Sequence, residues 1–433
     1  MKRRNFLQAG PIACAAALPF LGEGKASPPL PAAPRPAFQD EKSKLKITGV
    51  RLVRTKPRRP LPLYTPAAGA FSPAGSEVAS PMSIYPEYKA MRSSFVPDFA
   101  MLWEFTVEIA TDKGLKGYGI GGIAGGPIVE GNLAKLLLGE DPFNVERLWD
   151  IMWRSSLSYG RMGVVMNAIS GVDLALWDLI GKALGMPVYK LLGGETKPRI
   201  PAYCTGNDIE QHIEFGFKRL KLALPYGPAD GREGMKKNVE LAKRTRALLG
   251  PEGDVMLDCW MALTERYTIE LEEMLEPYRI YWLEECLPPY DYEGYGRLNA
   301  QIKSTRIVTG EHEYTRYGFR NLLEHRSAAV WQPEIRWCGG VTEIRRIAAL
   351  AAAYDIPVIP HLGGAGEGGS RDTVHFIMAT PNSPWAEFFF PPPGGPPEVY
   401  KRFEEDNLIT RGPEGIYTRP SEEPGFGLDI EVV

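Results

Sequence analysis

The sequence lacks the features that identify several common protein classes. Its five cysteines form no Cys-x-x-Cys pair, so a zinc or thiol redox motif has no support. Its net charge is −3, so it lacks the basic excess of a nucleic-acid-binding domain. No apolar run reaches the length of a membrane span, and we expect no spanning helix. The cysteines beyond the N-terminal segment are expected to be buried free thiols: Cys204, Cys259, Cys286 and Cys338.

The first 44 residues have the composition of a targeting segment and a linker. Paired arginines and Phe-Leu occupy residues 3–7, a mildly apolar stretch covers residues 9–21, and small residues suit cleavage after Ala26. Residues 1–26 thus resemble a twin-arginine export signal, which predicts an exported, periplasmic protein. The alternative is a basic N-terminus on a cytoplasmic protein. Residues 27–44 form a Pro/Ala-rich linker.

Acidic residues and one histidine follow short apolar runs at regular intervals in the second half of the chain. These residues are Asp258, Glu284, Glu311, Glu334, His361 and Glu387. The interval is about 25 residues, the length of one strand, one helix and two short loops. Repeated units of this kind close into a barrel whose active site lies at the carboxyl ends of the strands. The pattern therefore predicts several carboxylates and one histidine in one mouth, the composition of a divalent-metal site beside a base.

The rest of the chain divides by its patterns into two folded parts. Residues 45–160 predict a small α+β domain, with strands at 45–55, 101–111 and 115–121, a turn at 112–114 and helices from 127 to 157. A long apolar helix is predicted at 164–184, and strand and helix patterns alternate to residue 390. We expect residues 161–390 to form the barrel and residues 391–433 to fold back on the first domain.

A glycine-rich stretch at residues 117–122 resembles a dinucleotide-binding loop. It follows a hairpin turn, whereas such a loop opens a helix after a parallel strand. We therefore expect no nucleotide site there.

Several segments together resemble one known family. Residues 167–178, Asn-Ala-Ile-Ser-Gly-Val-Asp-Leu-Ala-Leu-Trp-Asp, are similar to the signature helix of the mandelate racemase branch of the enolase superfamily. The segments 256–261, 282–289, 310–312, 337–340 and 424–427 resemble, more narrowly, acid-sugar dehydratases of the L-rhamnonate type. The likeness covers residues 45–433. It implies an α/β fold, a (β/α)7β modified TIM barrel with an N-terminal α+β capping domain, and one Mg²⁺ per subunit.

The resemblance implies that Asp258, Glu284 and Glu311 are the metal ligands. Elementary chemistry agrees, because Mg²⁺ is a hard ion that prefers oxygen ligands. Three carboxylates brought together without a cation would repel one another and raise their own pKa values. The alternative for each residue is a salt-bridge partner. Glu285 is expected to face away from this group, because alternate residues of a strand face opposite sides; the alternative is that Glu285 is the ligand instead of Glu284.

The resemblance also implies the residues that act on the substrate. His361 matches the general base, which suits proton transfer near neutral pH. Glu334 stands where the family has an aspartate that orients this histidine. Glu387 matches a carboxyl that donates a hydrogen bond to the enediolate intermediate. The alternatives are a packed histidine at 361 and a peripheral salt bridge at Glu387.

The absence of a second lysine reduces the number of reactions that the site could catalyse. Residues 216–223 resemble a pattern with two lysines; Lys221 fits the first, which assists the substrate carboxylate, but Ala223 replaces the second. One-base chemistry favours dehydration of an aldonate-like 2,3-dihydroxy acid to a 2-keto-3-deoxy acid by a lyase. The alternatives are a racemase or epimerase of a 2-hydroxy acid and a catalytically decayed, metal-bearing protein that binds sugar acids.

Substrate contacts are expected from two further residues. Arg92 matches a lid arginine and His312 a substrate-contacting residue of the dehydratases; the alternative for Arg92 is a solvated loop charge. The loop at 362–369 lacks the family's histidines and serines, and no histidine precedes His212. We therefore expect a small-molecule acid sugar other than L-rhamnonate. The sequence leaves open whether the chain forms a homo-oligomer.

Overall fold

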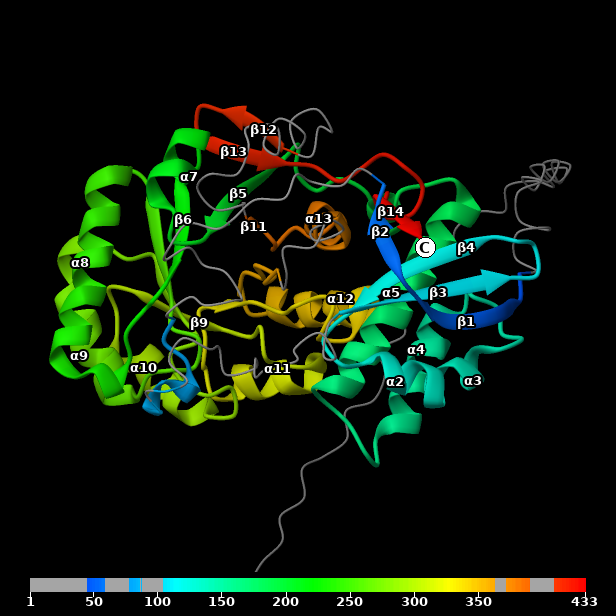
Figure 1. The fold of residues 1–433 in the computed structure, drawn as a ribbon, viewed down its shortest axis with the longest axis horizontal. Helices are drawn as coiled ribbons and strands as arrows, with labels where there is room; N and C mark the ends of the chain where they lie inside the picture. Colours follow the sequence, from blue (N-terminus) through cyan, green and yellow to red (C-terminus); the bar gives the residue numbers. More distant parts are fainter. Residues whose placement is uncertain (1–44, 59–77, 86, 88–103, 363–370, 390–408) are drawn as a thin grey trace, which may run out of the picture. The chain divides into compact units, whose positions relative to one another are not determined.

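The computed structural model describes residues 45–58, 78–85, 87, 104–362, 371–389 and 409–433 (Figure 1). Every structural statement below concerns these residues. The predicted export signal and linker lie outside them, as do Arg92 and residues 363–369 of the loop after His361.

An antiparallel sheet with helices forms the N-terminal part. The sheet has the order β1-β3-β4, made of β1 (Ile47–Val53), β3 (Phe105–Thr111) and β4 (Lys116–Gly121). The β3–β4 hairpin turns at residues 112–114, as the sequence predicts. The helical segments that follow are α2 (Gly126–Ile128), the π-turn η4 (Val129–Leu133), α3 (Ala134–Leu137) and α4 (Val145–Ser156). An isolated turn, η1 (Pro81–Ile84), precedes β3.

The long apolar helix α5 (Val164–Leu184) has the predicted bounds. It ends at Gly185, whose φ of 65° suits a residue without a Cβ, and Pro187 follows. By length and composition alone, α5 is apolar enough to cross a membrane. However, 94% of its apolar window is buried inside the protein. Its composition is therefore also that of a core helix.

The glycines of β4 permit a close contact between this strand and α5. A Cβ on Gly119 would lie 2.2 Å from the Gly171 carbonyl oxygen and 2.3 Å from the Ala175 nitrogen. A Cβ on Gly117 would lie 2.2 Å from the Ala175 carbonyl oxygen. Side chains at these positions would collide with helix backbone. The glycine-rich stretch therefore serves helix–strand packing, in agreement with the expectation that it holds no nucleotide.

Two buried aspartates of α5 connect this helix to other parts of the fold. The Asp178 carboxylate accepts hydrogen bonds from the Tyr118 nitrogen at 2.9 Å and the Phe426 nitrogen at 3.0 Å. The Asp173 carboxylate accepts one from the Thr342 nitrogen at 2.9 Å, and burial raises the pKa of Asp173 to about 7. One helix thus fixes β4, the C-terminal segment and the start of α12 (Gly340–Ala352).

Parallel strands form the barrel, as predicted. They are β5 (Ile200–Thr205), β6 (Arg219–Ala223), β7 (Asp254–Asp258), β8 (Trp282–Glu284), β9 (Arg306–Thr309), β10 (Val330–Trp331) and β11 (Ala386–Phe389). Neighbours from β5 to β10 pair in parallel, and β11 pairs with β5. A parallel bridge between Trp331 and Val358 marks one further strand position between β10 and β11. These pairings confirm the (β/α)7β barrel.

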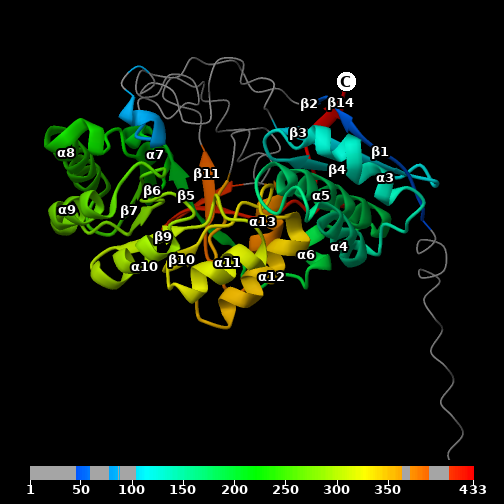
Figure 2. The same ribbon diagram turned by 90° about the horizontal axis from the view of Figure 1, so that it is seen from below.

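Helices alternate with these strands and cover the barrel (Figure 2). They are α7 (Ile209–Phe215), α8 (Gly231–Leu249), α9 (Glu265–Leu275), α10 (Tyr292–Gln301), α11 (Thr315–Glu324), α12 (Gly340–Ala352) and α13 (Arg371–Met378). Shorter connections are α6 (Val188–Leu191), η5 (Pro228–Asp230) and η6 (Glu276–Tyr278). Side-chain caps begin two of the helices: Thr264 accepts from the Tyr267 nitrogen, and Asp291 from the Gly294 nitrogen.

The barrel strands separate two apolar layers. Six side chains form an inner cluster: Tyr203, Met256, Trp282, Val308, Val330 and Ile359. Their strand neighbours, such as Val255 and Leu257, belong to the large core that also includes residues of the covering helices. Both faces of these strands are therefore buried, which explains why they appear in the sequence as continuous apolar runs.

The C-terminal residues divide between the two parts of the fold. The strand β14 (Ile430–Val432) pairs with β2 (Thr55–Pro57), so this end returns to the N-terminal part as predicted. The hairpin of β12 (Ile409–Gly412) and β13 (Gly415–Thr418) instead pairs with the barrel strand β5. The exact domain boundaries stay predictions.

The contact between β4 and α5 is testable by adding one methyl group. We expect Gly119→Ala to lower the stability by about 1–3 kcal/mol, because its Cβ would meet backbone atoms that cannot move aside. The measurement is the midpoint of urea-induced unfolding. Gly131→Ala is the matched control, since a Cβ there meets nothing within 4 Å, and its midpoint should stay level or rise. Equal midpoints for both variants would contradict the packing role.

Candidate active site

Strand periodicity brings three of the predicted site residues to the barrel mouth. Met256, Trp282 and Ile359 point into the barrel as members of the inner cluster. Asp258, Glu284 and His361 each lie two residues further along, and side chains two residues apart on a strand share a face. The same alternation that fills the barrel with apolar side chains therefore aims these polar groups into the mouth.

Glu311 reaches the mouth by a different route. The inner residue Val308 would place position 310 in the mouth, but that residue is Gly310, whose φ is 132°. A Cβ on Gly310 would lie 2.9 Å from the Gln332 nitrogen. The glycine turns the chain at the end of β9, and Glu311 follows with its side chain directed at the other carboxylates.

Asp258, Glu284 and Glu311 form one buried cluster whose ligand oxygens all lie within 4.8 Å of one another. Each pair of unit charges at this distance repels by at least roughly 3 kcal/mol at an effective dielectric constant of about 20. Lys221 is the buried cation beside them, with Nζ 2.6 Å from Glu284 and 3.8 Å from Asp258. One lysine does not offset three carboxylates.

Burial and mutual repulsion favour protons or a further cation at the cluster. Burial raises the pKa of Glu284 to about 8, with Lys221 opposing the shift and Asp258 adding to it. Burial likewise raises the pKa of Glu311 to about 7, against the effect of His361. The buried Oε2 of Glu311 has no hydrogen-bond partner among the described residues. An oxygen-preferring divalent cation fits this donor set.

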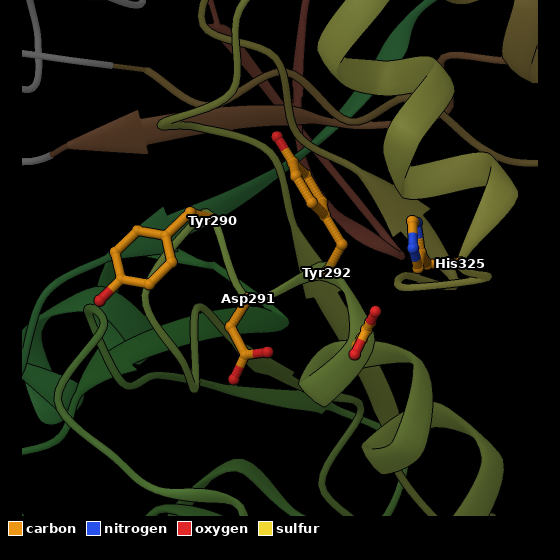
Figure 3. A pocket seen from close by; sticks show the side chains of 5 residues that line it. Tyr290, Asp291, Tyr292 and His325 are labelled. Atoms are coloured by element: carbon orange, nitrogen blue, oxygen red, sulfur yellow. The ribbon is translucent and has the colours of Figure 1, made fainter.

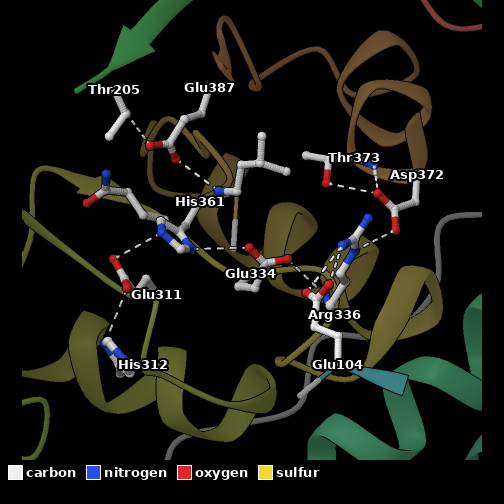
Figure 4. A network of polar contacts seen from close by, with 12 residues as sticks. Glu104, Thr205, Glu311, His312, Glu334, Arg336, His361, Asp372, Thr373 and Glu387 are labelled. Carbon is white, nitrogen blue, oxygen red and sulfur yellow. Dashed lines mark hydrogen bonds and ion pairs between the residues drawn. The ribbon is translucent and has the colours of Figure 1, made fainter. Parts of the chain in front are cut away.

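His361 lies beside the cluster and contacts two carboxylates (Figure 4). Its Nδ1 is 3.1 Å from Glu334 Oε2, and its Nε2 is 3.5 Å from Glu311 Oε2. Burial alone would lower the pKa of His361, but Glu311 and Glu334 outweigh it and raise the value to about 10. Glu334 thus reaches the histidine although it is one methylene longer than the aspartate of the resembling family.

Glu387, on β11, lies on the Lys221 side of the mouth. Its Oε1 is 2.9 Å from Lys221 Nζ and accepts the Thr205 hydroxyl, and its Oε2 accepts the Leu362 nitrogen at 2.9 Å. Burial would raise the pKa of Glu387, but Lys221 and His361 outweigh burial and lower it. In these contacts the carboxyl accepts hydrogen bonds, whereas the role implied by the resemblance is that of a donor.

His312 is partly exposed and lies on the other side of Glu311. Its Nδ1 is 2.8 Å from Glu285 Oε2 and 3.7 Å from Glu311 Oε1. Glu285 does not face away from the cluster as expected: one ligand atom each of Glu285, Glu311 and His312 lie within 4.8 Å of one another. Its φ of 45° breaks the strand alternation after Glu284 and turns the buried carboxylate toward His312. Burial opposes protonation of His312, but Glu285 and Glu311 outweigh it and raise its pKa to about 9.

Several contact residues of the site were missed in the sequence. Gln332 donates a hydrogen bond to Glu284 at 2.7 Å, and Thr205 bonds Glu387. Both lie two residues beyond an inner-cluster residue, so the strand period could have indicated them. Arg336 and Trp337 lie in the loop after β10, for which no simple sequence period exists.

A separate surface pocket does not involve the site. It is lined by Tyr290, Asp291, Tyr292, Glu293 and His325 (Figure 3). None of the predicted site residues that the structure describes lines this pocket. The lid arginine Arg92 lies outside the described residues, so its predicted role stays a prediction.

Comparison with known proteins agrees with this fold. Residues 104–193 match the mandelate racemase/muconate lactonizing enzyme N-terminal domain, and residues 206–432 match the enolase C-terminal domain-like family. An L-rhamnonate dehydratase of Saccharopolyspora erythraea is 42% identical over 356 residues, which cover 82% of this chain and 89% of that protein.

Solved structures show the same relationship. The rhamnonate dehydratase from Gibberella zeae complexed with Mg has a TM-score of 0.75 at 36% identity, covering 89% of this chain and 94% of that one. The 3,6-anhydro-D-galactonate cycloisomerase from Zobellia galactanivorans has a TM-score of 0.64 at 30% identity, covering 76% and 91%. The carboxylate cluster at the barrel mouth, the two matching domains and these relatives lead to one conclusion: the chain belongs to the mandelate racemase/muconate lactonizing enzyme family of the enolase superfamily, in its rhamnonate dehydratase-like group.

Proposed function

We propose that the protein is a Mg²⁺-dependent acid-sugar dehydratase that converts an aldonate-like 2,3-dihydroxy acid to a 2-keto-3-deoxy acid. The observation that carries the proposal is the placement of His361, paired with Glu334, directly beside the cluster of Asp258, Glu284 and Glu311. The similarity to an L-rhamnonate dehydratase at 42% identity supports the reaction class.

The three carboxylates are proposed to hold the metal. When bound, Mg²⁺ supplies positive charge that offsets these carboxylates and stabilises the negative charge that develops on a substrate carboxylate. Asp258, Glu284 and Glu311 would each supply oxygen to the ion, which would also attract the carboxylate of the substrate. Lys221 adds a fixed positive charge at the same end of the barrel, and Glu387 and Glu284 hold its ammonium group.

His361 is proposed to move the proton. A cation held by Glu311 would offset the charge that raises the pKa of His361 and would so favour the neutral ring. Because Nδ1 faces Glu334, the neutral ring carries its proton on Nδ1 and presents Nε2 toward the cluster as the base. Nε2 takes the α-proton, and the electron pair of the C–H bond forms the enediolate. The bond between C3 and its hydroxyl then breaks, His361 returns a proton to the departing oxygen, and water leaves. The resulting enol tautomerises to the 2-keto-3-deoxy acid.

The structure gives the racemase alternative little support. Ala223 lies at the end of β6, opposite Asp258 in register, where a second basic side chain would be needed. Its backbone is held by Asn207, which donates to the Ala223 carbonyl at 3.0 Å and accepts from its nitrogen at 3.0 Å. No base occupies this position, so we propose one-base dehydration.

Turnover of a panel of acid sugars with Mg²⁺ tests the proposal. We expect formation of a 2-keto product from at least one aldonate, with loss of activity after chelation. Exchange of solvent deuterium into the α-position without loss of water would favour the racemase or epimerase. Mg²⁺ binding without turnover of any acid sugar would favour the decayed binding protein.

We further propose that residues 1–26 direct export through the twin-arginine route. The support is the paired arginines at Arg3 and Arg4 with the apolar stretch that follows. Cell fractionation of the full chain, compared with a variant in which both arginines are lysine, tests this proposal.

Shortening the partner of the base should slow the reaction. Glu334→Asp withdraws the carboxylate by about 1.5 Å from a present distance of 3.1 Å, so we expect kcat to fall by roughly 10- to 100-fold. Glu334→Gln keeps the length of the side chain but removes its charge, so it separates the effect of distance from the effect of charge. Steady-state kinetics with saturating Mg²⁺ measures both variants. A faster Glu334→Asp enzyme would contradict the proposed role and would favour a decayed site.

The pH should control both metal affinity and metal-free stability. Glu284 and Glu311 have raised pKa values of about 8 and 7, so Mg²⁺ must displace protons at lower pH, and its affinity should rise as the pH rises through these values. His312 and His361, at about 9 and 10, act in the same direction. Isothermal titration at pH 6.5 and 8.5 measures this, and an unchanged affinity would contradict it.

The same pKa shifts determine how the stability of the folded protein changes with pH. The folded metal-free protein holds protons that the unfolded chain releases, because all four folded pKa values exceed the unfolded ones. Its stability should therefore fall as the pH rises from about 4.5 toward 10. Saturating Mg²⁺ should flatten this dependence, which thermal unfolding with and without the metal measures.

A further inference from the structure

The loop between β10 and α12 connects the site to the N-terminal part of the fold. Glu334 in this loop contacts His361. Two residues later, the Arg336 carbonyl accepts a hydrogen bond from the Gly122 nitrogen at 3.2 Å, and Gly122 directly follows β4. The next residue is Trp337. A single short segment thus contacts the base on one side and the N-terminal part on the other.

Arg336 fixes this loop from within the protein. Its side chain is 1% exposed, and its Nε is 3.1 Å from Asp372 while its Nη1 is 3.2 Å from Glu104 (Figure 4). The Arg336 nitrogen also donates to Glu334 Oε1 at 3.1 Å. Two carboxylates on a buried guanidinium hold the loop in one conformation, since breaking such a buried pair is costly.

The Trp337 indole lies against both imidazoles of the site. Its ring centroid is 5.4 Å from that of His361 and 5.5 Å from that of His312, with interplanar angles of 45° and 38°. These distances are those of direct ring contact. Glu334 and Glu285 each restrain one histidine through Nδ1, and the indole restrains the plane of each ring from the other direction.

Gly122 provides the space for this indole. A Cβ on Gly122 would lie 2.3 Å from Trp337 Cδ1, 2.7 Å from its Nε1 and 2.9 Å from the Asn167 Cγ. The φ of Gly122 is not in the left-handed region, so an alanine could adopt its backbone conformation. The glycine is therefore needed for the space that the indole fills.

We propose that Trp337 is a positioning residue, whose indole rests on Gly122 of the N-terminal part and sets the orientation of the His361 and His312 rings. The N-terminal part thereby controls the geometry of proton transfer without touching the reacting atoms. This inference rests on the proposed function, because it assigns the positioning to the base of that reaction. A rotated imidazole loses rate, since a displacement of about 1 Å can cost on the order of 100-fold.

The kinetic test uses one change on each side of the contact. Gly122→Ala should push the indole and lower kcat by about tenfold or more, with Mg²⁺ affinity unchanged. Trp337→Leu should do the same, and Trp337→Phe, which keeps an aromatic face, should recover most of the rate. In the Trp337→Leu background Gly122→Ala should have little further effect, because the group that it displaces is gone. Gly131→Ala, in open space in the same N-terminal part, should match the wild type.

A second measurement does not depend on turnover. The chain has five histidines, so a spectrum of ¹³C-labelled histidine rings is simple enough to assign with His361→Asn and His312→Asn. Gly122→Ala and Trp337→Leu should each shift the ring signals of His361 and His312, because the ring current of the indole moves or disappears. The signals of His212 and His375, whose rings pack elsewhere, should stay in place and serve as internal references.

The outcomes separate the two ideas. If no acid sugar were turned over by the wild type, the proposed function would fail, while the spectra would still decide the positioning of the rings. Unshifted His361 and His312 signals in a folded Gly122→Ala protein would overturn the inference. So would a loss of kcat that simply follows a loss of stability or of Mg²⁺ affinity in every variant.

Discussion

The crowding of three carboxylates in a buried barrel mouth is the constraint on which the rest of the structure depends. Asp258, Glu284 and Glu311 are held within 4.8 Å of one another by strands that are themselves buried on both faces. Such a group is unstable unless a cation or protons compensate it, and Lys221 alone is insufficient. The fold therefore holds negative charges close together, and a divalent cation would reduce their repulsion. The same crowding and burial raise the pKa values of Glu284 and Glu311.

The proposed base, His361, lies next to this cluster. His361 faces Glu311 through Nε2 and Glu334 through Nδ1, so the histidine is oriented by a carboxylate on each side. The packing of β4 on α5 is made possible by glycines, and it brings Gly122 to the loop that carries Glu334 and Trp337. A glycine-rich segment far from the chemistry is thus connected to the orientation of the proposed base through ordinary packing.

Most of the barrel could be predicted because its signals are local. Each strand is a short apolar run and each site residue stands at the end of one, so the spacing of Asp258, Glu284 and His361 indicated the barrel and its mouth. The helix α5 passes a test of length and composition for a membrane helix, because the core helix of a large protein has the same composition. The pairing of the hairpin β12–β13 with the barrel strand β5 was not predicted, because alternation within one strand does not indicate which strand it pairs with.

The sequence by itself determined that Asp258, Glu284 and His361 share a face with the inner residues before them, because side chains two residues apart on a strand point the same way. Glu311 enters the mouth only through the turn at Gly310. The tertiary structure alone decided the contacts among them. These contacts join residues from different loops. Glu334 reaches His361, Glu285 turns to His312, and Trp337 packs on Gly122 and contacts both histidines. Such contacts depend on backbone turns and on packing across the fold, and the local periodicity of the sequence does not predict them.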